Sequence, residues 1–287
     1  MGSECRTGRA GVRLRRIGQP LIGLLLLLTS CSVAASAAGH PPSPVSGKAE
    51  GRWVLTWRDE FNGSDGLKQW RVQVGGWDLQ QLQWYDANAL SLDGHGHLVI
   101  TASHNSAGHL CWYGSCRYSS GRIDTYGIFS QTYGRFEARI KLPAGRGLWP
   151  AFWLEGANVG QVASPGEIDV IETNGHNSEL VQSFAHLYDN RYKAFSLKLP
   201  KPLSAGYHVY RIDWTPKGIT LFVDGRAYGH LNAYAGWPFN HPFFIIINLA
   251  VGGIWPGPPD SNTRFPAHML VDWVRVYREV APPKIRS

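Results

Sequence analysis

The segment from Arg135 to Leu142 alternates strictly between charged and apolar residues. Side chains of a β-strand alternate between two faces, so the apolar residues of this segment lie on one face and the charged residues on the other. The segment Met269 to Tyr277 alternates less strictly, and Phe243 to Leu249 is a continuous apolar run that suits a strand buried on both faces. No convincing amphipathic helix accompanies them, so the pattern predicts strands as the building elements.

Turn residues separate these runs, and the chain holds 33 glycines and 18 prolines. The run Ile219 to Val223 is followed by Asp224-Gly225 and a second run from Arg226, which is typical of a hairpin with a tight turn. Many short strands between turn signals predict an all-β fold, either a sandwich or a jelly roll.

The first 38 residues carry the pattern of an export signal. Five arginines precede an apolar run from Leu21 to Leu28, which is far shorter than the roughly 20 residues that span a bilayer. Two processing outcomes stay open. The segment Leu28 to Cys31 is typical of a lipoprotein signal, with Cys31 as the lipidated residue, whereas the small residues Ala35 to Ala38 would release a soluble protein. We expect an exported protein, extracellular or anchored at the cell surface.

Residues 39–51 are rich in Pro, Ser and Gly and predict a linker, and residues 52–287 predict one domain. Residues 1–30 hold five arginines and one glutamate, which is +4 of the formal net charge of +7, so the remainder is near +3. A charge this small does not favour nucleic-acid binding. All twelve tryptophans lie beyond residue 50, and tryptophan is a natural platform for sugar rings as well as a core residue.

The cysteines divide into two groups. Cys5 and Cys31 belong to the signal region, which leaves Cys111 and Cys116. In an exported protein, two cysteines five positions apart predict a local disulfide that pins a loop. A metal pair is the alternative, but no second Cys/His pair of matching spacing accompanies them.

Three acids stand within the six positions Glu167 to Glu172, although charged residues make up only 17% of the chain. In a regular strand Glu167 and Asp169 share one face, and Glu172 falls out of phase. One extra residue at Val170-Ile171, a β-bulge, would bring all three acids onto one surface. Bulges are enriched beside active sites because they re-aim side chains, so we predict a bulge here.

Such a triplet predicts glycoside hydrolysis. Three adjacent carboxylates cannot all ionise cheaply, so their pKa values spread and at least one is raised. A retaining glycosidase needs an ionised nucleophile and a protonated acid about 5 Å apart. The alternative is a solvent-facing strand edge where acids serve solubility, which explains a triplet flanked by Gly166 and set among tryptophans less well.

Four sequence motifs follow one another along the chain. They are Gly134–Pro143 (GRFEARIKLP), Gly147–Leu154 (GLWPAFWL), Gly166–Glu172 (GEIDVIE) and Asn248–Gly253 (NLAVGG). Their content and order resemble the family 16 glycoside hydrolases, specifically the laminarinase-like branch, over roughly residues 53–278. The resemblance implies a concanavalin-like β-jelly roll of two antiparallel sheets, with a substrate cleft across its concave sheet.

The resemblance also implies roles for the acids. Glu167 matches the nucleophile, Asp169 the residue that tunes it, and Glu172 the acid/base of a retaining mechanism that uses no cofactor. Two residues between Asp169 and Glu172 resemble the laminarinase-type spacing, whereas lichenases and xyloglucan-active relatives have one residue there.

Further positions match substrate-binding residues of the family. Trp149 and Trp153 match aromatics that line the cleft, although a core role stays open for one of them. His186 lies where relatives often have a histidine close to the acid/base, with a histidine satisfied by neighbouring backbone as the alternative. The remaining candidates for sugar binding are Arg122, Asn248, Trp255 and Trp84.

One stretch departs from the family pattern. Relatives commonly show an Asn-Asn-Glu-x-Gln-Tyr-Tyr-like sequence near the glycone end of the cleft, where residues 77–85 read WDLQQLQWY. Gln81 replaces the usual acid and Trp84 adds bulk, which leaves the substrate preference open.

The family often holds a structural calcium on the convex side, far from the cleft. Asp272 matches its side-chain ligand, with Glu60 and Gly96 as further contributors through backbone or carboxylate oxygens, and oxygen ligands suit calcium. An exposed strand aspartate without a metal is the alternative.

These features predict an exported, monomeric endo-β-1,3-glucanase with a polysaccharide substrate, no nucleic-acid partner, and no membrane contact other than a lipid at Cys31. Two alternatives stay open. One is a hydrolase or transglycosylase of the same fold that acts on another polysaccharide, such as mixed-linkage glucan or galactan. The other is a non-catalytic carbohydrate-binding module, against which the intact acid triplet argues.

Overall fold

β-Strands form nearly all of the regular structure in the described part of the chain. The computed structural model describes residues 52–63, 66–76, 79–104, 108–162, 165–187 and 191–280. The predicted export signal (1–38), with Cys31, and the predicted linker (39–51) lie outside the described residues, so these assignments stay predictions. Within the described ranges, no helix is long and apolar enough to cross a membrane.

The elements, in chain order, are β1 (Arg52–Asp59), β2 (Arg71–Val72), β3 (Gly75–Gly76), β4 (Gln83–Tyr85), the 3₁₀-helix η1 (Ala87–Ala89), β5 (Leu90–Leu92), β6 (Leu98–His104), β7 (Leu110–Cys111), β8 (Gly114–Ser115), β9 (Tyr118–Ser120), β10 (Arg122–Asp124), β11 (Gly134–Lys141), β12 (Leu148–Gly156), β13 (Glu167–Glu172), β14 (Leu180–His186), β15 (Tyr192–Lys198), β16 (His208–Thr215), β17 (Gly218–Val223), β18 (Arg226–Asn232), β19 (Phe243–Val251) and β20 (Ala267–Val280).

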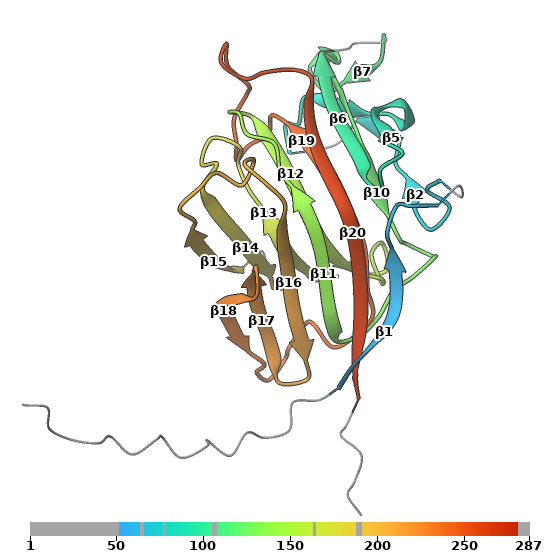
Figure 1. Cartoon of the computed structure of the whole chain (residues 1–287), viewed down its shortest axis with the longest axis vertical. Helices are drawn as coiled ribbons and strands as arrows, with labels where there is room; N and C mark the ends of the chain where they lie inside the picture. Colours follow the sequence, from blue (N-terminus) through green and yellow to red (C-terminus); the bar gives the residue numbers. More distant parts are fainter. Residues whose placement is uncertain are drawn as a thin grey trace, which may run out of the picture. The chain divides into compact units, whose positions relative to one another are not determined.

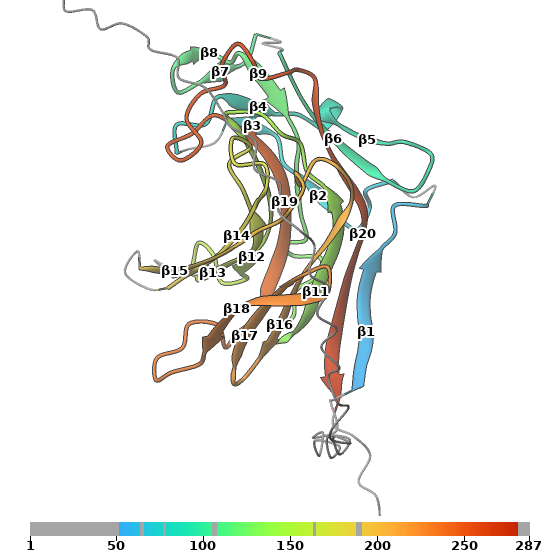
Figure 2. The ribbon, with the colours of Figure 1, turned by 60° about the vertical axis from the view of Figure 1, so that its left-hand side comes forward.

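Two large sheets carry the fold. The larger has eleven strands in the order β18-β17-β16-β11-β20-β6-β9-β4-β3, with β1 added to β20 and β5 to β6, and the smaller has seven in the order β15-β14-β13-β12-β19-β10-β2. In Figure 1 the strands β16, β11 and β20 run side by side, and Figure 2 separates them from β12 to β15 of the smaller sheet. The predicted all-β sandwich is confirmed.

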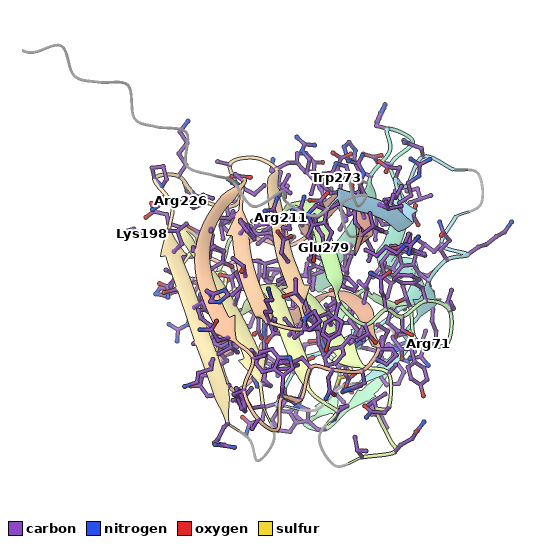
Figure 3. The ribbon with its side chains drawn as sticks, turned by 90° about the horizontal axis from the view of Figure 1, so that it is seen from below. Arg71, Lys198, Arg211, Arg226, Trp273 and Glu279 are labelled. Carbon is purple, nitrogen blue, oxygen red and sulfur yellow. A yellow bond between two sulfur atoms is a disulfide. The ribbon has the colours of Figure 1, made fainter. Side chains whose placement is uncertain are left out.

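The strand order fixes which side chains are far apart. Arg71 on β2 and Lys198 on β15 belong to the two edge strands of the smaller sheet, and they lie at opposite ends of the molecule in Figure 3. The middle of this sheet is formed by β13, β12 and β19. A substrate that crosses the sheet from edge to edge therefore passes over these three strands.

The hydrophobic core draws on alternate residues of both sheets. The apolar side chains of β11 are fully buried and its charged ones are not, as the alternation predicts. All nine residues of β19 are buried, which confirms the prediction of a strand covered on both faces. Of these, Ile245, Ile247 and Leu249 belong to the core cluster. The alternate residues, including Asn248, face the opposite side of the smaller sheet and are available to a site there.

The predicted hairpin is present between β17 and β18. Asp224 and Gly225 have φ angles of 48° and 78°, and two successive positive φ values are the requirement of a type I′ turn. A type I′ turn matches the right-handed twist of the strands. Asp-Gly predicts this turn because both residues accept positive φ angles.

Candidate active site

The three acids lie on β13, and a bulge brings them together. On the β12 side, Ile171 pairs with Phe152 and Asp169 pairs with the next residue, Trp153, so that Val170 is the extra residue. The pairing with β14 shifts at the same place. Val170 and Ile171 are both fully buried. The predicted bulge is therefore confirmed, and it restores the phase that a regular strand would lose before Glu172.

The acids open into one cavity, called here the acid hollow. Its walls come from β10, β12, β13 and β19 and from the segment before β4. The lining residues are Leu79, Gln81, Arg122, Trp149, Ala151, Trp153, Glu167, Asp169, Glu172 and Asn248. The structure thus places the three acids beside four of the predicted sugar-binding residues, two of them tryptophans.

Two side chains contact the acids directly. The indole Nε1 of Trp149 donates a hydrogen bond to Oε1 of Glu172. The ring Nε2 of His186 lies 3.3 Å from Oε1 of Glu167 and 3.1 Å from Oδ2 of Asp169. His186 therefore borders the acid pair from β14, while Trp149 holds Glu172 from β12.

The pKa values of all three acids are raised. Burial, and then the charge of Asp169, raise the pKa of Glu167 well above its usual value, while the charge of His186 opposes the shift. Burial, and then the charge of Glu172, raise the pKa of Asp169 well above its usual value. Burial raises the pKa of Glu172 to about 7, against the hydrogen bond from Trp149. The triplet therefore keeps its protons to higher pH than free carboxyl groups do, chiefly because burial disfavours the charged forms, and for Glu167 and Asp169 also because neighbouring carboxylates repel them.

A network of hydrogen bonds orients the floor of the hollow. Trp153 Nε1 donates to Oδ1 of Asn248 at 2.8 Å, and Asn248 Nδ2 donates to the hydroxyl of Tyr85 at 3.2 Å. The guanidinium of Arg122 lies 5.0 Å from the ring centre of Trp153. Burial raises the pKa of Tyr85 to about 12, so its hydroxyl stays protonated. The floor is therefore fixed before a sugar arrives.

Two residues of this site were missed by the sequence reasoning. Tyr85 is fully buried, and its hydroxyl lies between Asn248 and Oε1 of Gln81. Glu155 lies directly opposite Glu167 in the pairing of β12 with β13, and burial raises its pKa, which the charge of Arg122 opposes. The spacing Trp153-x-Glu155 could have signalled it, because side chains two apart share a face of a strand.

Trp255 and Trp84 lie outside the lining of the hollow. Trp255 packs edge-on against Trp149, with ring centres 5.6 Å apart, so it supports the wall. Trp84 stacks on His109 at 4.5 Å, because its neighbours Gln83 and Tyr85 take the buried face of β4 and Trp84 takes the other. Sugar binding by Trp84 near the glycone end of the cleft stays a prediction.

The two carboxylates expected at the calcium site each lie against an arginine. The carboxylate of Glu60 accepts two hydrogen bonds of 2.8 Å from Arg275, and Asp272 is paired with Arg139. Gly96 does lie beside the backbone carbonyl of Glu60. Both carboxylates are therefore paired with arginines, while backbone carbonyls are also ligands that calcium accepts, so calcium at this position stays a prediction.

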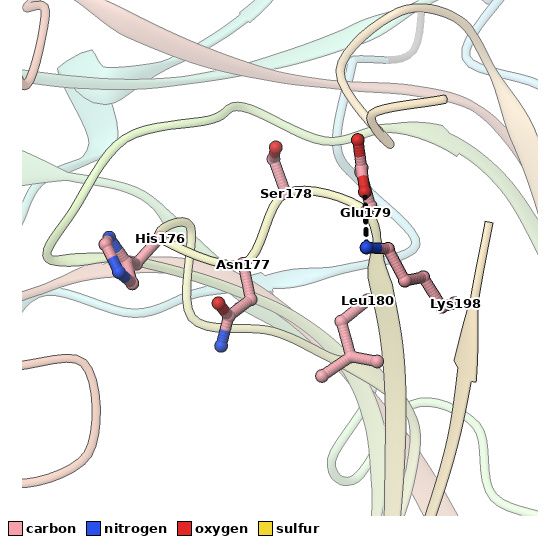
Figure 4. Close-up of a pocket in the computed structure, with 6 residues that line it drawn as sticks. All are labelled: His176, Asn177, Ser178, Glu179, Leu180 and Lys198. Atoms are coloured by element: carbon pink, nitrogen blue, oxygen red, sulfur yellow. Dashed lines mark ion pairs between the residues drawn. The ribbon is translucent and has the colours of Figure 1, made fainter. Parts of the chain in front are cut away.

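A second hollow lies at the start of β14, and Figure 4 shows its lining. Its charged residues are Glu179 and Lys198, whose carboxylate and ammonium groups are 3.2 Å apart. A single carboxylate paired with a cation offers no nucleophile and acid pair. The acid hollow is therefore the candidate active site.

Comparisons with known proteins agree with this geometry. The model of the glycosyl hydrolases family 16 matches residues 77–275. The chain is 36% identical to the beta-glucanase of Rhodothermus marinus, over 94% of this chain and 98% of that protein. The laminarinase catalytic domain of Thermotoga maritima MSB8 superimposes with a TM-score of 0.74 at 35% identity, covering 79% of this chain and 99% of that one. The endo-beta-1,3-glucanase of Pyrococcus furiosus gives 0.75 at 36% identity, covering 81% and 97%.

Proposed function

Because the chain belongs to the glycosyl hydrolases family 16, we propose that it is a retaining glycoside hydrolase that cleaves β-1,3-glucan internally. The observation that carries the proposal is the bulge on β13, which puts three carboxyl groups with raised pKa values into one hollow. Relatives named as glucanases and laminarinases support the substrate class.

In the first step Glu172 acts as the acid and Glu167 as the nucleophile. The protonated carboxyl of Glu172 gives its proton to the glycosidic oxygen, and a carboxylate oxygen of Glu167 attacks the anomeric carbon. The bond from that carbon to the leaving oxygen breaks, and an ester between Glu167 and the sugar forms. A pKa of about 7 for Glu172 suits this role, because the group still holds its proton near neutral pH.

In the second step Glu172 acts as the base. Its carboxylate takes a proton from a water molecule, whose oxygen attacks the anomeric carbon and displaces Glu167. The ester breaks, Glu167 regains its charge, and Glu172 regains its proton. Two displacements at one carbon leave the β-configuration unchanged.

The neighbouring groups shift the acids towards the protonation states that the two steps need. His186 contacts both Glu167 and Asp169, and its charge favours the ionised form of Glu167. The bond from Trp149 stabilises the carboxylate form of Glu172 between the two steps. The side chain of Asp169 is only 3% exposed. A proton held on Asp169 reduces the repulsion between its carboxyl group and those of Glu167 and Glu172.

The test is a timed digest of laminarin, mixed-linkage glucan, agarose and galactan with product sizing. We expect rapid loss of laminarin chain length with a ladder of oligosaccharides, which is the pattern of internal cleavage. The double variant Glu167→Gln/Glu172→Gln is the matched control and is expected to release no reducing sugar. Release by that variant, or cleavage of galactan in preference to laminarin, would contradict the proposal.

The proposal includes export of a monomeric enzyme. The arginines and the apolar run Leu21 to Leu28 support it, as does the disulfide between Cys111 and Cys116, since disulfides persist in oxidising compartments. Labelling with radioactive palmitate in the native host distinguishes the two fates. Incorporation that is lost in Cys31→Ala means a lipid anchor, and unlabelled activity in the medium means release.

A further inference from the structure

Trp112 is a large apolar side chain that remains 60% exposed. It belongs to the hairpin of β7 and β8, which is closed by the disulfide between Cys111 and Cys116. An exposed tryptophan exposes apolar area that water disfavours, and the reaction mechanism gives this hairpin no role. Its position and rigidity therefore call for a separate explanation.

Several contacts fix the exposed ring in place. The indole Nε1 of Trp112 donates a 2.8 Å hydrogen bond to the backbone carbonyl of Gln81. The neighbouring ring of Tyr113 stands edge-on to it at 5.3 Å, and the Tyr113 hydroxyl donates a 2.6 Å hydrogen bond to the carbonyl of Leu82. With the disulfide, these bonds tie the hairpin to the segment before β4. A ring held this way loses little conformational freedom when a ligand stacks on it.

The same segment continues into the active site. The side chain of Gln81 lines the acid hollow, while its carbonyl holds Trp112. Leu79 also lines the hollow and is itself 46% exposed. Gln81 therefore both lines the acid hollow and contacts Trp112. A polymer that lies in the acid hollow and leaves it on this side meets the tryptophan.

We infer that Trp112 is a stacking platform for a sugar ring of the polysaccharide. This ring is several sugar units away from the glycosidic bond that is cut. This inference rests on the proposed function and names a binding position that lies outside the acid hollow. The apolar C–H face of a pyranose ring packs on the indole, whose N–H is already bonded to Gln81. The disulfide keeps the platform at a constant distance from the acids, so only chains long enough to span that distance gain from it.

The experiment measures kcat and KM on β-1,3-linked glucose oligosaccharides of increasing length. We expect Trp112→Ala to match the wild type on the shortest cleaved substrate. On long chains its KM should rise roughly tenfold with little change in kcat, since tenfold corresponds to about 1.4 kcal/mol of lost binding. Trp112→Phe should recover most of the loss, because it keeps an aromatic face. The variant Cys111→Ser/Cys116→Ser should show a smaller loss in the same direction.

The matched control is Tyr234→Ala, which removes an aromatic ring that is 45% exposed and packs against Trp237 instead of the hairpin. It should leave the length dependence unchanged. Equal losses on short and long chains in Trp112→Ala would show a structural role and overturn the inference, as would no change on either. Failure of the proposed function is distinguishable, because the wild type itself would then not cleave these substrates.

Discussion

On the smaller sheet the three acids of β13 crowd into one hollow, whereas on the larger sheet each of several acids lies against an arginine. Glu60 accepts two hydrogen bonds from Arg275, and Asp213 accepts two from Arg135. The hydrogen bonds from Arg275 lower the pKa of Glu60, while burial raises the pKa values of the three β13 acids, with repulsion from neighbouring carboxylates adding to the rise for Glu167 and Asp169. The same residue types therefore stabilise one sheet and are kept reactive on the other.

The difference follows from what faces each acid across the strands. Opposite charges in cross-strand pairs stabilise a sheet and like charges directly opposite destabilise it. On β13, Glu167 faces Glu155 across one interface and His186 across the other. On the larger sheet, Arg135 of β11 lies directly opposite Asp213 of β16. The smaller sheet thus gives up stability at the place where a reaction needs both a proton and a charge.

The largest expected effect is on catalysis. Glu167→Gln should lower kcat/KM on laminarin about a thousandfold or more, because the nucleophile is lost. Asp213→Asn removes a carboxylate of the larger sheet and should leave kcat/KM unchanged. Initial rates at several substrate concentrations measure both. A large loss of kcat/KM in Asp213→Asn would contradict the proposed difference between the acids of the two sheets.

The second effect is on stability, and its dependence on pH is the reverse of the dependence that an ordinary ion pair gives. The pKa of Glu172 is about 7 in the folded protein, above the value of 4.5 for the unfolded chain. Its contribution to the free energy of unfolding is therefore fully present below pH 4.5 and is lost as the pH rises through 7. Glu172→Gln should therefore raise the free energy of unfolding by about 1–3 kcal/mol at pH 8. At pH 4 it should have little effect. Denaturant unfolding at the two pH values measures this, and equal changes at both would contradict the raised pKa.

The third effect has the opposite pH dependence. Arg275→Met removes the partner of Glu60, whose folded pKa is lowered, so the pair stabilises the fold above the unfolded pKa and is lost as the pH falls through the folded pKa. Because both side chains are partly exposed, the variant should lose about 1 kcal/mol or less at pH 7. The loss should shrink below pH 4. Unfolding curves across this range measure it, and a loss that grew towards acid pH would break the comparison.

The smallest effect is on the pH profile. The charge of His186 lowers the pKa of Glu167, and Glu167 must be ionised to attack. His186→Ala should therefore move the acid limb of kcat/KM to higher pH by less than about one unit. His208→Ala, on β16 of the larger sheet, is the control and should leave the limb in place. A shift to lower pH in His186→Ala would contradict the assigned role.

Much of the fold could be predicted because it depends on neighbours in sequence. The alternation along β11, the Asp224-Gly225 turn and the apolar run of β19 are local patterns, and each gave the correct element. The bulge at Val170 could also be predicted, because an odd interval before Glu172 leaves no other way to place the three acids on one face.

The remaining features depend on which distant segments meet. Tyr85 reaches Asn248 only because β4 and β19 are brought together through the sheets, 163 positions apart in the chain. The position of Trp84 outside the acid hollow could not be predicted, because the sequence does not say which face of a three-residue strand points to the site. The arginine partners of Glu60 and Asp272, 215 and 133 positions away, likewise could not be paired from sequence.

The central claim is that Glu167 and Glu172 work as nucleophile and acid/base in two displacements. Proton NMR of the products in the first minutes of laminarin hydrolysis tests it directly, by the configuration of the newly formed anomeric centre before mutarotation. Two displacements predict that the β-anomer appears first and the α-anomer only later. Initial release of the α-anomer would mean a single displacement by water and would contradict the account.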